Sequence, residues 1–242
     1  MKMYKKVMAA ALAGVMTVSM SATAFAADDD GYILKATNED SKSSDNDLVI
    51  AIEGSVSSMD PANIPDTNAI SATRGVYETL VSFDENQELT GKLAESWEVS
   101  DDSLTYTFKL RQGVKFQDGT DFNAAAVKAN YDRVVNKDNN LRQRRTFIVT
   151  NEDGSETPRV DSIETPDDYT LVIKLTQAWA PFINRLTQFC IISPAALEEY
   201  GNDIMNHPCG TGPYVCTEWE EGDHTSFERN ESRRPSGLRK TR

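Results

Sequence analysis

The residue types best suited to metal or nucleophilic chemistry gather near the end of the chain, at His207, Cys209, Cys216 and His224. Imidazole and thiolate groups are the usual ligands of zinc, and a cysteine paired with a histidine can act as a nucleophile. Structural zinc sites usually contain a closer cysteine pair, roughly two to four residues apart, whereas six residues lie between Cys209 and Cys216. A metal-dependent or thiol hydrolase is one interpretation of this cluster, and buried cysteines in strands are the other.

The other segments of suggestive composition do not complete a catalytic motif. The serine-rich Gly54–Ser58 lacks the second glycine of a nucleophile elbow, and Gly210–Pro213 lacks the lysine of a phosphate-binding loop. The run Arg142–Arg145 could bind a carboxylate through paired N–H groups, or it could be a solvated surface patch. These segments therefore predict no catalytic residue.

The composition limits the partners and the covalent structure. The formal net charge is −13, and a strongly acidic chain is a poor partner for nucleic acid, because phosphate binding needs a basic face. Three cysteines allow one disulfide at most, and Cys209–Cys216 across a turn is the pair that we consider. A disulfide scaffold is excluded, so a hydrophobic core must hold the fold together.

The N-terminus has the pattern of a secretory signal peptide. Three lysines precede the apolar run Val7–Met20, and Ala24-Phe25-Ala26 is a small-x-small cleavage site. This pattern predicts that residues 1–26 are removed and that the rest is exported, to the periplasm or the cell surface. Residues 27–47 are rich in acidic side chains and predict a disordered tether.

Hydrophobic periodicity locates the elements that would position candidate residues. The run Leu48–Ile52 predicts a buried strand, and a loop at 53–65 leads into a helix. Strands with alternating apolar side chains are predicted at Ser103–Leu110 and Asp167–Leu175, as neighbours in one sheet. The apolar face of the helix would consist of Ile70, Val76, Tyr77 and Leu80.

The stretch KFQDGTDFNAAAVKAN, Lys115–Asn130, predicts a strand, a turn and a helix. Asp118-Gly119 is a turn dipeptide, and Asn123 can cap the helix that follows. Four residues of this helix fall on one apolar face: Val127, Tyr131, Val134 and Val135.

Turn and cap signals locate the last elements. Ser193-Pro194 predicts the start of a helix that Gly201 ends. Gly210–Tyr214 predicts a turn that leads into a strand, and Glu221–Asp223 predicts a hairpin connection. From 230 to 242 the chain is basic and nearly free of large apolar residues, which predicts an aberrant tail that cannot pack.

Several of these segments together resemble a known family. The string from Lys92 to Asn130, KLAESWEVSDDSLTYTFKLRQGVKFQDGTDFNAAAVKAN, is similar to the signature region of family 5 of the bacterial extracellular solute-binding proteins, which serve ABC importers of peptides, nickel or glutathione. Ser58–Pro61, Ile192–Leu197 and Gly210–Tyr214 agree with the family in order. Within the family, the opening stretch together with ISPAALEEYG is most similar to the members that bind glutathione.

This resemblance implies an α/β, periplasmic-binding-protein-like fold of type II, in the peptide-binding class. Residues 48–68 and 177–229 would form the first ligand-binding lobe, and 69–176 would form an inserted α/β domain that braces it. The family's second lobe is missing, so the fold would be incomplete and the chain a truncated product. One lobe supplies one wall of a cleft, so we expect a dissociation constant for glutathione of roughly millimolar at best.

The resemblance also implies a function and a site. The chain would capture glutathione or short peptides as a monomer and deliver them to the permease subunits of an ABC importer. The loop after the first strand lines the cleft in relatives, which indicates Ser55, Val56 and Ser57; the segments of Arg144 and Phe189 approach the cleft in some relatives. No catalytic residue, cofactor or metal is implied, and an exported hydrolase that uses the Cys/His cluster remains the alternative.

Overall fold

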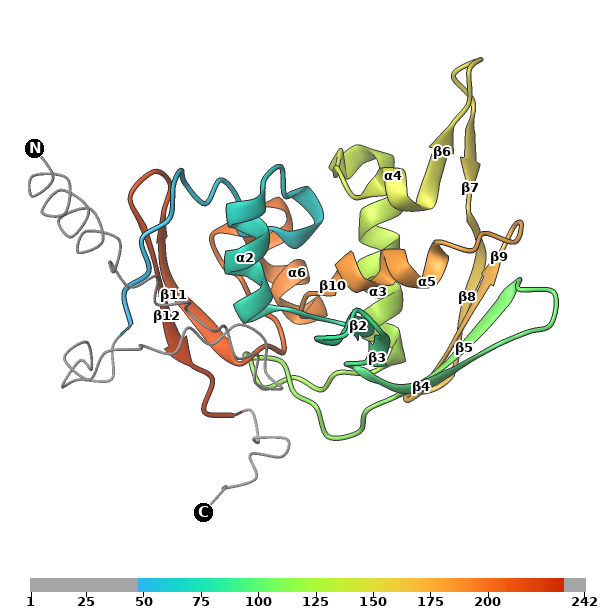
Figure 1. Ribbon diagram of the computed structural model, residues 1–242, viewed down its shortest axis with the longest axis horizontal. Coiled ribbons are helices and arrows are strands. Elements are labelled where there is room, and N and C mark those ends of the chain that lie inside the picture. The colour runs from blue at the N-terminus through green and yellow to red at the C-terminus, as the bar shows by residue number, and fades with distance from the viewer. Residues whose placement is uncertain (1–47, 233–242) are drawn as a thin grey trace, which may run out of the picture. The chain divides into compact units, whose positions relative to one another are not determined.

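The computed structural model describes residues 48–232 (Figure 1). The predicted signal peptide and acidic tether lie outside the described residues, as does the basic tail from residue 233. The chain divides into two units, Met1–Ala51 and Ile52–Arg242, and the elements below belong to the second. Among the described residues, no helix combines the length and the apolar character that crossing a membrane requires.

The apolar run Leu48–Ile52 is not the buried strand that the sequence predicts. None of its residues belongs to a strand, and its side chains are largely exposed: Leu48 by 68%, Val49 by 92%, Ile50 by 56% and Ile52 by 51%. A continuous apolar run becomes a buried strand only where neighbouring strands satisfy its backbone N–H and C=O groups. Whether such neighbouring strands exist depends on distant parts of the chain, and a local apolar pattern cannot show this.

The largest sheet consists of four antiparallel strands in the order β4-β5-β9-β8, with β4 at Ala94–Val99, β5 at Thr105–Leu110, β9 at Thr170–Leu175 and β8 at Val160–Asp167. The prediction that the two alternating strands are neighbours is confirmed. Tyr106 pairs with Ile173, and Phe108 pairs with Leu171. All four side chains are buried on one face of the sheet, which the period of two along each strand dictates.

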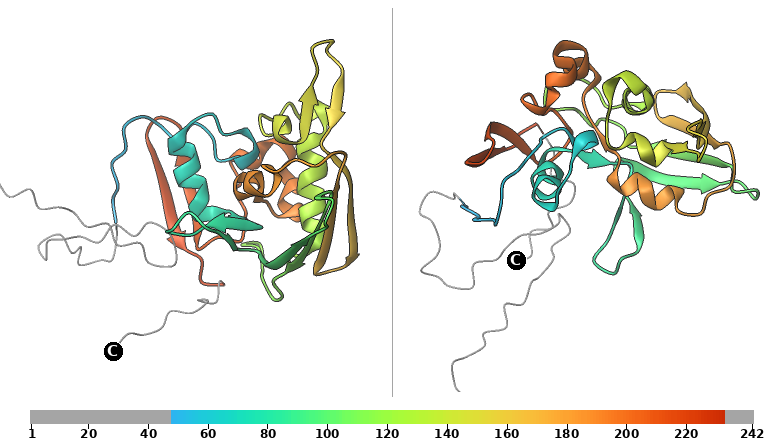
Figure 2. Two further views of the ribbon diagram at one scale, coloured as in Figure 1. Left: turned by 45° about the vertical axis from the view of Figure 1, so that its right-hand side comes forward. Right: turned by 90° about the horizontal axis from the view of Figure 1, so that it is seen from above.

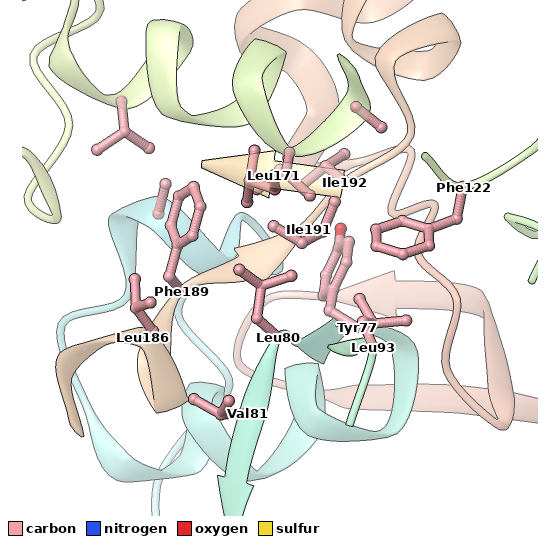
Figure 3. Close-up of a cluster of buried hydrophobic side chains, with 14 of the residues drawn as sticks. Tyr77, Leu80, Val81, Leu93, Phe122, Leu171, Leu186, Phe189, Ile191 and Ile192 are labelled. Atoms are coloured by element: carbon pink, nitrogen blue, oxygen red, sulfur yellow. The ribbon is translucent and has the colours of Figure 1, made fainter. Parts of the chain in front are cut away.

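Two helices cover this buried face. Helix α3 (Ala124–Val135) and the short helix α5 (Phe182–Arg185) lie beside the sheet, and α3 contacts β8 (Figures 1 and 2). The ring of Phe182, on α5, lies 4.9 Å from that of Tyr106. Figure 3 shows the side chains that meet beside the sheet, with Leu171 close to α3 and with Leu80 and Ile191 next to it. A hydrophobic core therefore holds the fold, as the cysteine count requires.

Replacing Phe108 with aspartate should destabilise the fold by more than about 3 kcal/mol, because it buries an unpaired charge at a fully buried position. Chemical denaturation followed by circular dichroism measures the change. Lys109→Asp, at the exposed neighbouring position, is the matched control and should change stability far less. Equal effects of the two substitutions would contradict the assignment of Phe108 to the buried face.

The stretch Lys115–Asn130 folds as the sequence predicts, except that its strand is reduced to a single bridge between Lys115 and Asp121. Gly119 occupies the turn with φ of 86°, a conformation that favours glycine. Asn123 caps α3 by accepting a hydrogen bond from the backbone N–H of Ala126 at 2.9 Å. On the predicted apolar face, Val127 and Val134 are buried, and Tyr131 and Val135 are partly buried.

The first predicted helix is shorter than its apolar pattern. Helix α2 spans Thr67–Val76, so Tyr77 and Leu80 lie beyond its end, and Ile70 is 40% exposed. Tyr77 and Leu80 are nevertheless fully buried, because the chain continues into the short strand β1 (Glu78–Thr79), which pairs with β10 (Cys190–Ile191). The apolar side chains of Tyr77 and Leu80 therefore belong to a buried extended segment and not to a helix face.

The last third of the chain follows the predicted turns and caps. Ser193 caps α6 (Pro194–Tyr200), which ends at Gly201. Strands β11 (Tyr214–Glu220) and β12 (His224–Arg229) form an antiparallel hairpin, and β11 contacts α2. The remaining elements are η2 (Pro61–Asn63), β2 (Val81–Phe83), β3 (Leu89–Gly91), η3 (Lys137–Asn139), α4 (Arg144–Phe147), β6 (Ile148–Thr150), β7 (Glu156–Pro158), η4 (Leu186–Gln188) and η5 (Gly201–Met205).

One residue of the predicted unpacked tail belongs to the fold. Asn230 is only 6% exposed, and its side-chain amide donates to the carbonyl of Gly212 at 2.9 Å. Its backbone N–H donates to the carbonyl of Pro213 at 2.7 Å. The prediction of a tail that begins at 230 was wrong at this position, because a short amide side chain can satisfy a turn without contributing apolar surface.

Candidate functional site

The loop that carries Ser55, Val56 and Ser57 has no strand or helix of its own until η2 begins at Pro61. Ser55 is exposed, Ser57 is half-buried, and the side chain of Val56 is 9% exposed and part of the core. The two serines are thus more exposed than the valine between them. Side chains from other elements must therefore fix the conformation of this loop.

Ser57 is held by the residue that caps α2. Its hydroxyl donates to one carboxylate oxygen of Asp66, while the other oxygen accepts from the backbone N–H of Ala69 at 2.9 Å. The hydrogen bond from Ser57, and then the one from Ala69, lowers the pKa of Asp66 below its ordinary value. Because the hydroxyl proton of Ser57 is used in this way, its free lone pairs remain to accept a hydrogen bond from a ligand.

Two further hydrogen bonds attach the backbone of the loop. The side-chain amide of Asn68 donates to the carbonyl of Glu53 at 2.7 Å. The indole N–H of Trp219, on β11, donates to the carbonyl of Val56 at 2.9 Å. The loop is thus attached to both α2 and the β11–β12 hairpin.

A buried ion pair fixes the far end of the loop. The guanidinium of Arg133, on α3, donates to the two carboxylate oxygens of Asp60 at 2.6 and 3.2 Å. The two side chains are 10% and 7% exposed. Asp60 also accepts from the backbone N–H of Ala62 at 3.0 Å, which caps η2. The paired geometry satisfies both groups, as burial of charge requires.

The two other predicted site residues, Arg144 and Phe189, make no hydrogen bond to Ser55, Val56 or Ser57 themselves. Gln143, next to Arg144, joins their segments to the loop's far end: its backbone N–H donates to the carbonyl of Ala62 at 3.0 Å, and its side-chain amide donates to the carbonyl of Gln188 at 2.7 Å.

Arg144 donates to both carboxylate oxygens of Glu156 at 2.6 and 2.8 Å, and to the carbonyl of Val135 at 2.9 Å. The pair with Glu156 raises the pKa of Arg144 and lowers that of Glu156. The carboxylate that the arginine run binds is therefore one of the chain's own.

Phe189 is a core residue in this structure. Its side chain is 3% exposed and lies in the cluster of Figure 3. Its ring is edge-on to that of Phe147, with ring centroids 5.2 Å apart. A ligand role for Arg144 or Phe189 stays a prediction. The arrangement of Ser55–Ser57 gives it no support.

The Cys/His cluster does not assemble into a metal or nucleophile site in the described residues. His207 stacks on Tyr200 with ring centroids 3.9 Å apart, whereas His224 contacts Asp223 at 2.9 Å and Glu218 at 3.2 Å. A histidine and two carboxylates, His224, Glu220 and Asp223, lie close enough to share an ion, but all three are exposed and no cysteine joins them.

The cysteines are not activated for nucleophilic attack either. All three are described and are free thiols, so the Cys209–Cys216 disulfide is absent from this part of the chain. Burial, followed by the charge of Asp118, raises the pKa of Cys209 to about 12, and burial raises the pKa of Cys190 to about 12. The thiolate, not the thiol, is the nucleophile, so the hydrolase interpretation has no assembled site.

Two hollows lie on the described surface. One of about 270 Å³ is open between α3 and α6, next to Arg133 and Leu197. The other, of about 600 Å³, is lined by residues of the four-stranded sheet that include Lys109 and Tyr169. Neither includes Ser55, Val56 or Ser57 among its lining residues.

Comparison with known proteins decides the family. Residues 88–235 match the family described as "Bacterial extracellular solute-binding proteins, family 5 Middle". The chain belongs to this family. Its members are binding proteins, which confirms the expectation of a binding protein and not an enzyme.

A similar relative is the glutathione-binding protein GsiB of Shigella dysenteriae, which is 38% identical over 218 residues. The match covers 89% of this chain and 37% of that protein, so the chain spans little more than a third of the relative's length.

Solved structures of the family have the same fold. NikZ from Campylobacter jejuni, in complex with Ni(L-His), is 28% identical with a TM-score of 0.64, covering 75% of this chain and 35% of its own. DppA from Helicobacter pylori, in complex with the peptide STSA, is 30% identical with a TM-score of 0.59, covering 73% and 37%. The expected periplasmic-binding-protein-like fold of type II is confirmed over this part of the chain.

Sequence reasoning missed the residues that hold the loop in place. Asp66 had a visible signal, because an aspartate directly before an amphipathic segment is a typical helix cap. Arg133 had none, since its partner lies 73 residues away. Trp219 had no specific signal either, because an isolated tryptophan predicts only a core or cleft-wall aromatic.

Proposed function

We propose that this chain belongs to the substrate-binding component of an ABC importer, which captures glutathione or short peptides outside the cytoplasmic membrane and delivers them to permease subunits. The observation that carries the proposal is the 38% identity, over 89% of this chain, to a protein named for glutathione binding. The signal-like N-terminus supports export to the periplasm or the cell surface, and we propose that the protein acts as a monomer.

We propose Ser55, Val56 and Ser57 as one wall of the ligand cleft. The exposed hydroxyl of Ser55 and the acceptor lone pairs of Ser57 suit the amide N–H groups of a peptide-like ligand. Attachment of the loop at Glu53, Val56 and Ser57 would hold these groups in place before the ligand arrives, which lowers the ordering cost of binding.

The division into a lobe and an inserted domain remains part of the proposal, with one adjustment. The boundary expected between 68 and 69 lies inside α2. We place all of α2 with the first lobe, because Gly75 lies directly beside the ring of Tyr214. Gln117, in the proposed inserted domain, would brace the lobe through backbone N–H donation to Gly210 at 2.9 Å and side-chain donation to Tyr214 at 2.8 Å.

Titration of the chain with glutathione, followed by NMR, should perturb the amide signals of residues 54–58 with a dissociation constant of roughly millimolar, as expected for one wall of a cleft. Ser57→Ala should weaken this binding several-fold, because it removes an acceptor on the proposed wall. Ser71→Ala is the matched control, since Ser71 is an exposed serine on α2 whose hydroxyl donates to its own helix at Thr67.

Two results would contradict the assignment of the site. The first is a set of perturbed signals that excludes residues 54–58. The second is a micromolar constant, because it would mean that these residues already enclose the ligand. Uptake of labelled glutathione by cells with and without the gene tests the function itself, and unchanged uptake in the deletion strain would refute it.

A further inference from the structure

Strand β11 contains one residue more than its partner strand requires. Cys216 pairs with Phe227, but the register then shifts, so that Glu218 pairs with Ser226 and Trp219 with Thr225. Thr217 is the extra residue, which makes this a β-bulge. Bulges redirect the side chains that follow them, so the consequence for Trp219 can be worked out from the pairing.

The bulge turns Trp219 toward the body of the fold. Side chains directly opposite each other in an antiparallel pair share a face, and residues two apart on one strand share a face. Thr225 and Phe227 therefore share a face, and so do their partners Trp219 and Cys216. In a regular strand, residues three apart point to opposite faces, and Trp219 would point the other way.

The burial of Trp219 and Cys216 agrees with this assignment, whereas Phe227, opposite Cys216 on the same face, is 37% exposed. Trp219 and Cys216 are both partly buried and pack against the hydrophobic core. On the opposite face, Glu218 and Glu220 are exposed, and Glu218 contacts His224 across the hairpin at 3.2 Å. The acidic side chains therefore lie on one face of the hairpin and the indole on the other.

The redirected indole has one polar partner, the carbonyl of Val56, at 2.9 Å. Val56 lies between Ser55 and Ser57, so this bond fixes the backbone from which both hydroxyls project. The indole N–H only donates, and a backbone carbonyl is a strong acceptor that burial would otherwise leave unpaired. The bond joins residues 163 apart in the sequence, so it ties the loop to the β11–β12 hairpin.

We infer that Trp219 is a positioning residue for the ligand loop, and that the bulge at Thr217 exists to aim its indole N–H at the carbonyl of Val56. The inference deepens the proposed function, since it concerns the same loop. It assigns to Trp219 no direct contact with the ligand. Loss of the N–H should therefore loosen the loop first and weaken ligand binding as a result.

Trp219→Phe tests this in the whole chain, because phenylalanine keeps an aromatic ring and removes the N–H. Backbone ¹⁵N order parameters of residues 55–57 should fall from about 0.85, typical of rigid backbone, towards about 0.6. Trp97→Phe, a partly buried tryptophan in β4, is the matched control and should leave these values unchanged. Deletion of Thr217, which removes the bulge, should loosen the same three residues.

The glutathione titration separates this inference from the proposed function. If the unsubstituted chain binds glutathione, Trp219→Phe should weaken binding about fivefold, as expected for one lost hydrogen bond. If the unsubstituted chain does not bind, the proposed ligand wall fails, uptake still tests the function, and the order parameters alone decide the role of Trp219. Unchanged order parameters in both Trp219→Phe and the Thr217 deletion would overturn the inference.

Discussion

Replacing Gly212 with alanine is expected to lower the free energy of unfolding by about 3 kcal/mol, because the new methyl group has no room. A Cβ atom at this position would lie 2.5 Å from the carbonyl oxygen of Gly75 and 2.6 Å from that of Val76. The close approach is part of the fold, since the backbone N–H of Gly212 donates to the carbonyl of Val76 at 2.8 Å. Urea denaturation of the two proteins measures the difference.

Gly75→Ala is the matched control, because this glycine lies on the other side of the same contact. Its Cβ would meet only the side chain of Tyr214, at 3.7 Å, which is an ordinary van der Waals distance. Gly75 is near the end of α2, where alanine should raise stability by about 0.5 kcal/mol. If both substitutions had the same effect, the contact between α2 and the turn at Gly212 would be looser than it is here.

The second large effect is expected at the buried ion pair. Asp60→Ala should cost about 3 to 5 kcal/mol, since it leaves the guanidinium of Arg133 buried without its carboxylate. Asp132→Ala is the control, because the pair Lys128–Asp132 is exposed, with side-chain exposures of 43% and 54%. Removal of that exposed pair should change stability by less than about 0.5 kcal/mol.

A double variant separates the charge from the packing. Arg133→Met removes the guanidinium and keeps a long apolar side chain, so Asp60→Asn combined with Arg133→Met should cost clearly less than the sum of the two single changes. Simple additivity, measured by denaturation of all four proteins, would mean that the two side chains do not interact in solution.

Local patterns predicted the parts of the fold that depend on neighbouring residues. The alternation at Tyr106 and Phe108 identifies a half-buried strand because the period of two is a property of the strand itself. The caps at Asn123 and Ser193 are equally local, since each side chain bonds a backbone N–H three residues on.

Parts that depend on distant residues could not be predicted in this way. The run Leu48–Ile52 has the composition of a buried strand, but the presence of partner strands is not encoded within it. The pairing of β1 with β10 buries Tyr77 and Leu80. The spacing of these two apolar residues happens to match a helical period, so the local pattern predicted a helix face. The candidate site shows the same limit, because the loop's serines are visible in the sequence while Trp219, which holds the loop, is 163 residues from Val56.

The buried thiol of Cys209 has a consequence for measuring how often the fold opens. With a pKa of about 12, about one thiol in 10⁵ is ionised at pH 7, and only the ionised form attacks a disulfide. Cys209 should therefore stay inert to a disulfide reagent in the closed protein and regain the reactivity of a free cysteine whenever its surroundings unfold. At reagent concentrations high enough that every opening leads to labelling, the labelling rate equals the opening rate. It therefore measures how often the region around the Gly210–Tyr214 turn unfolds.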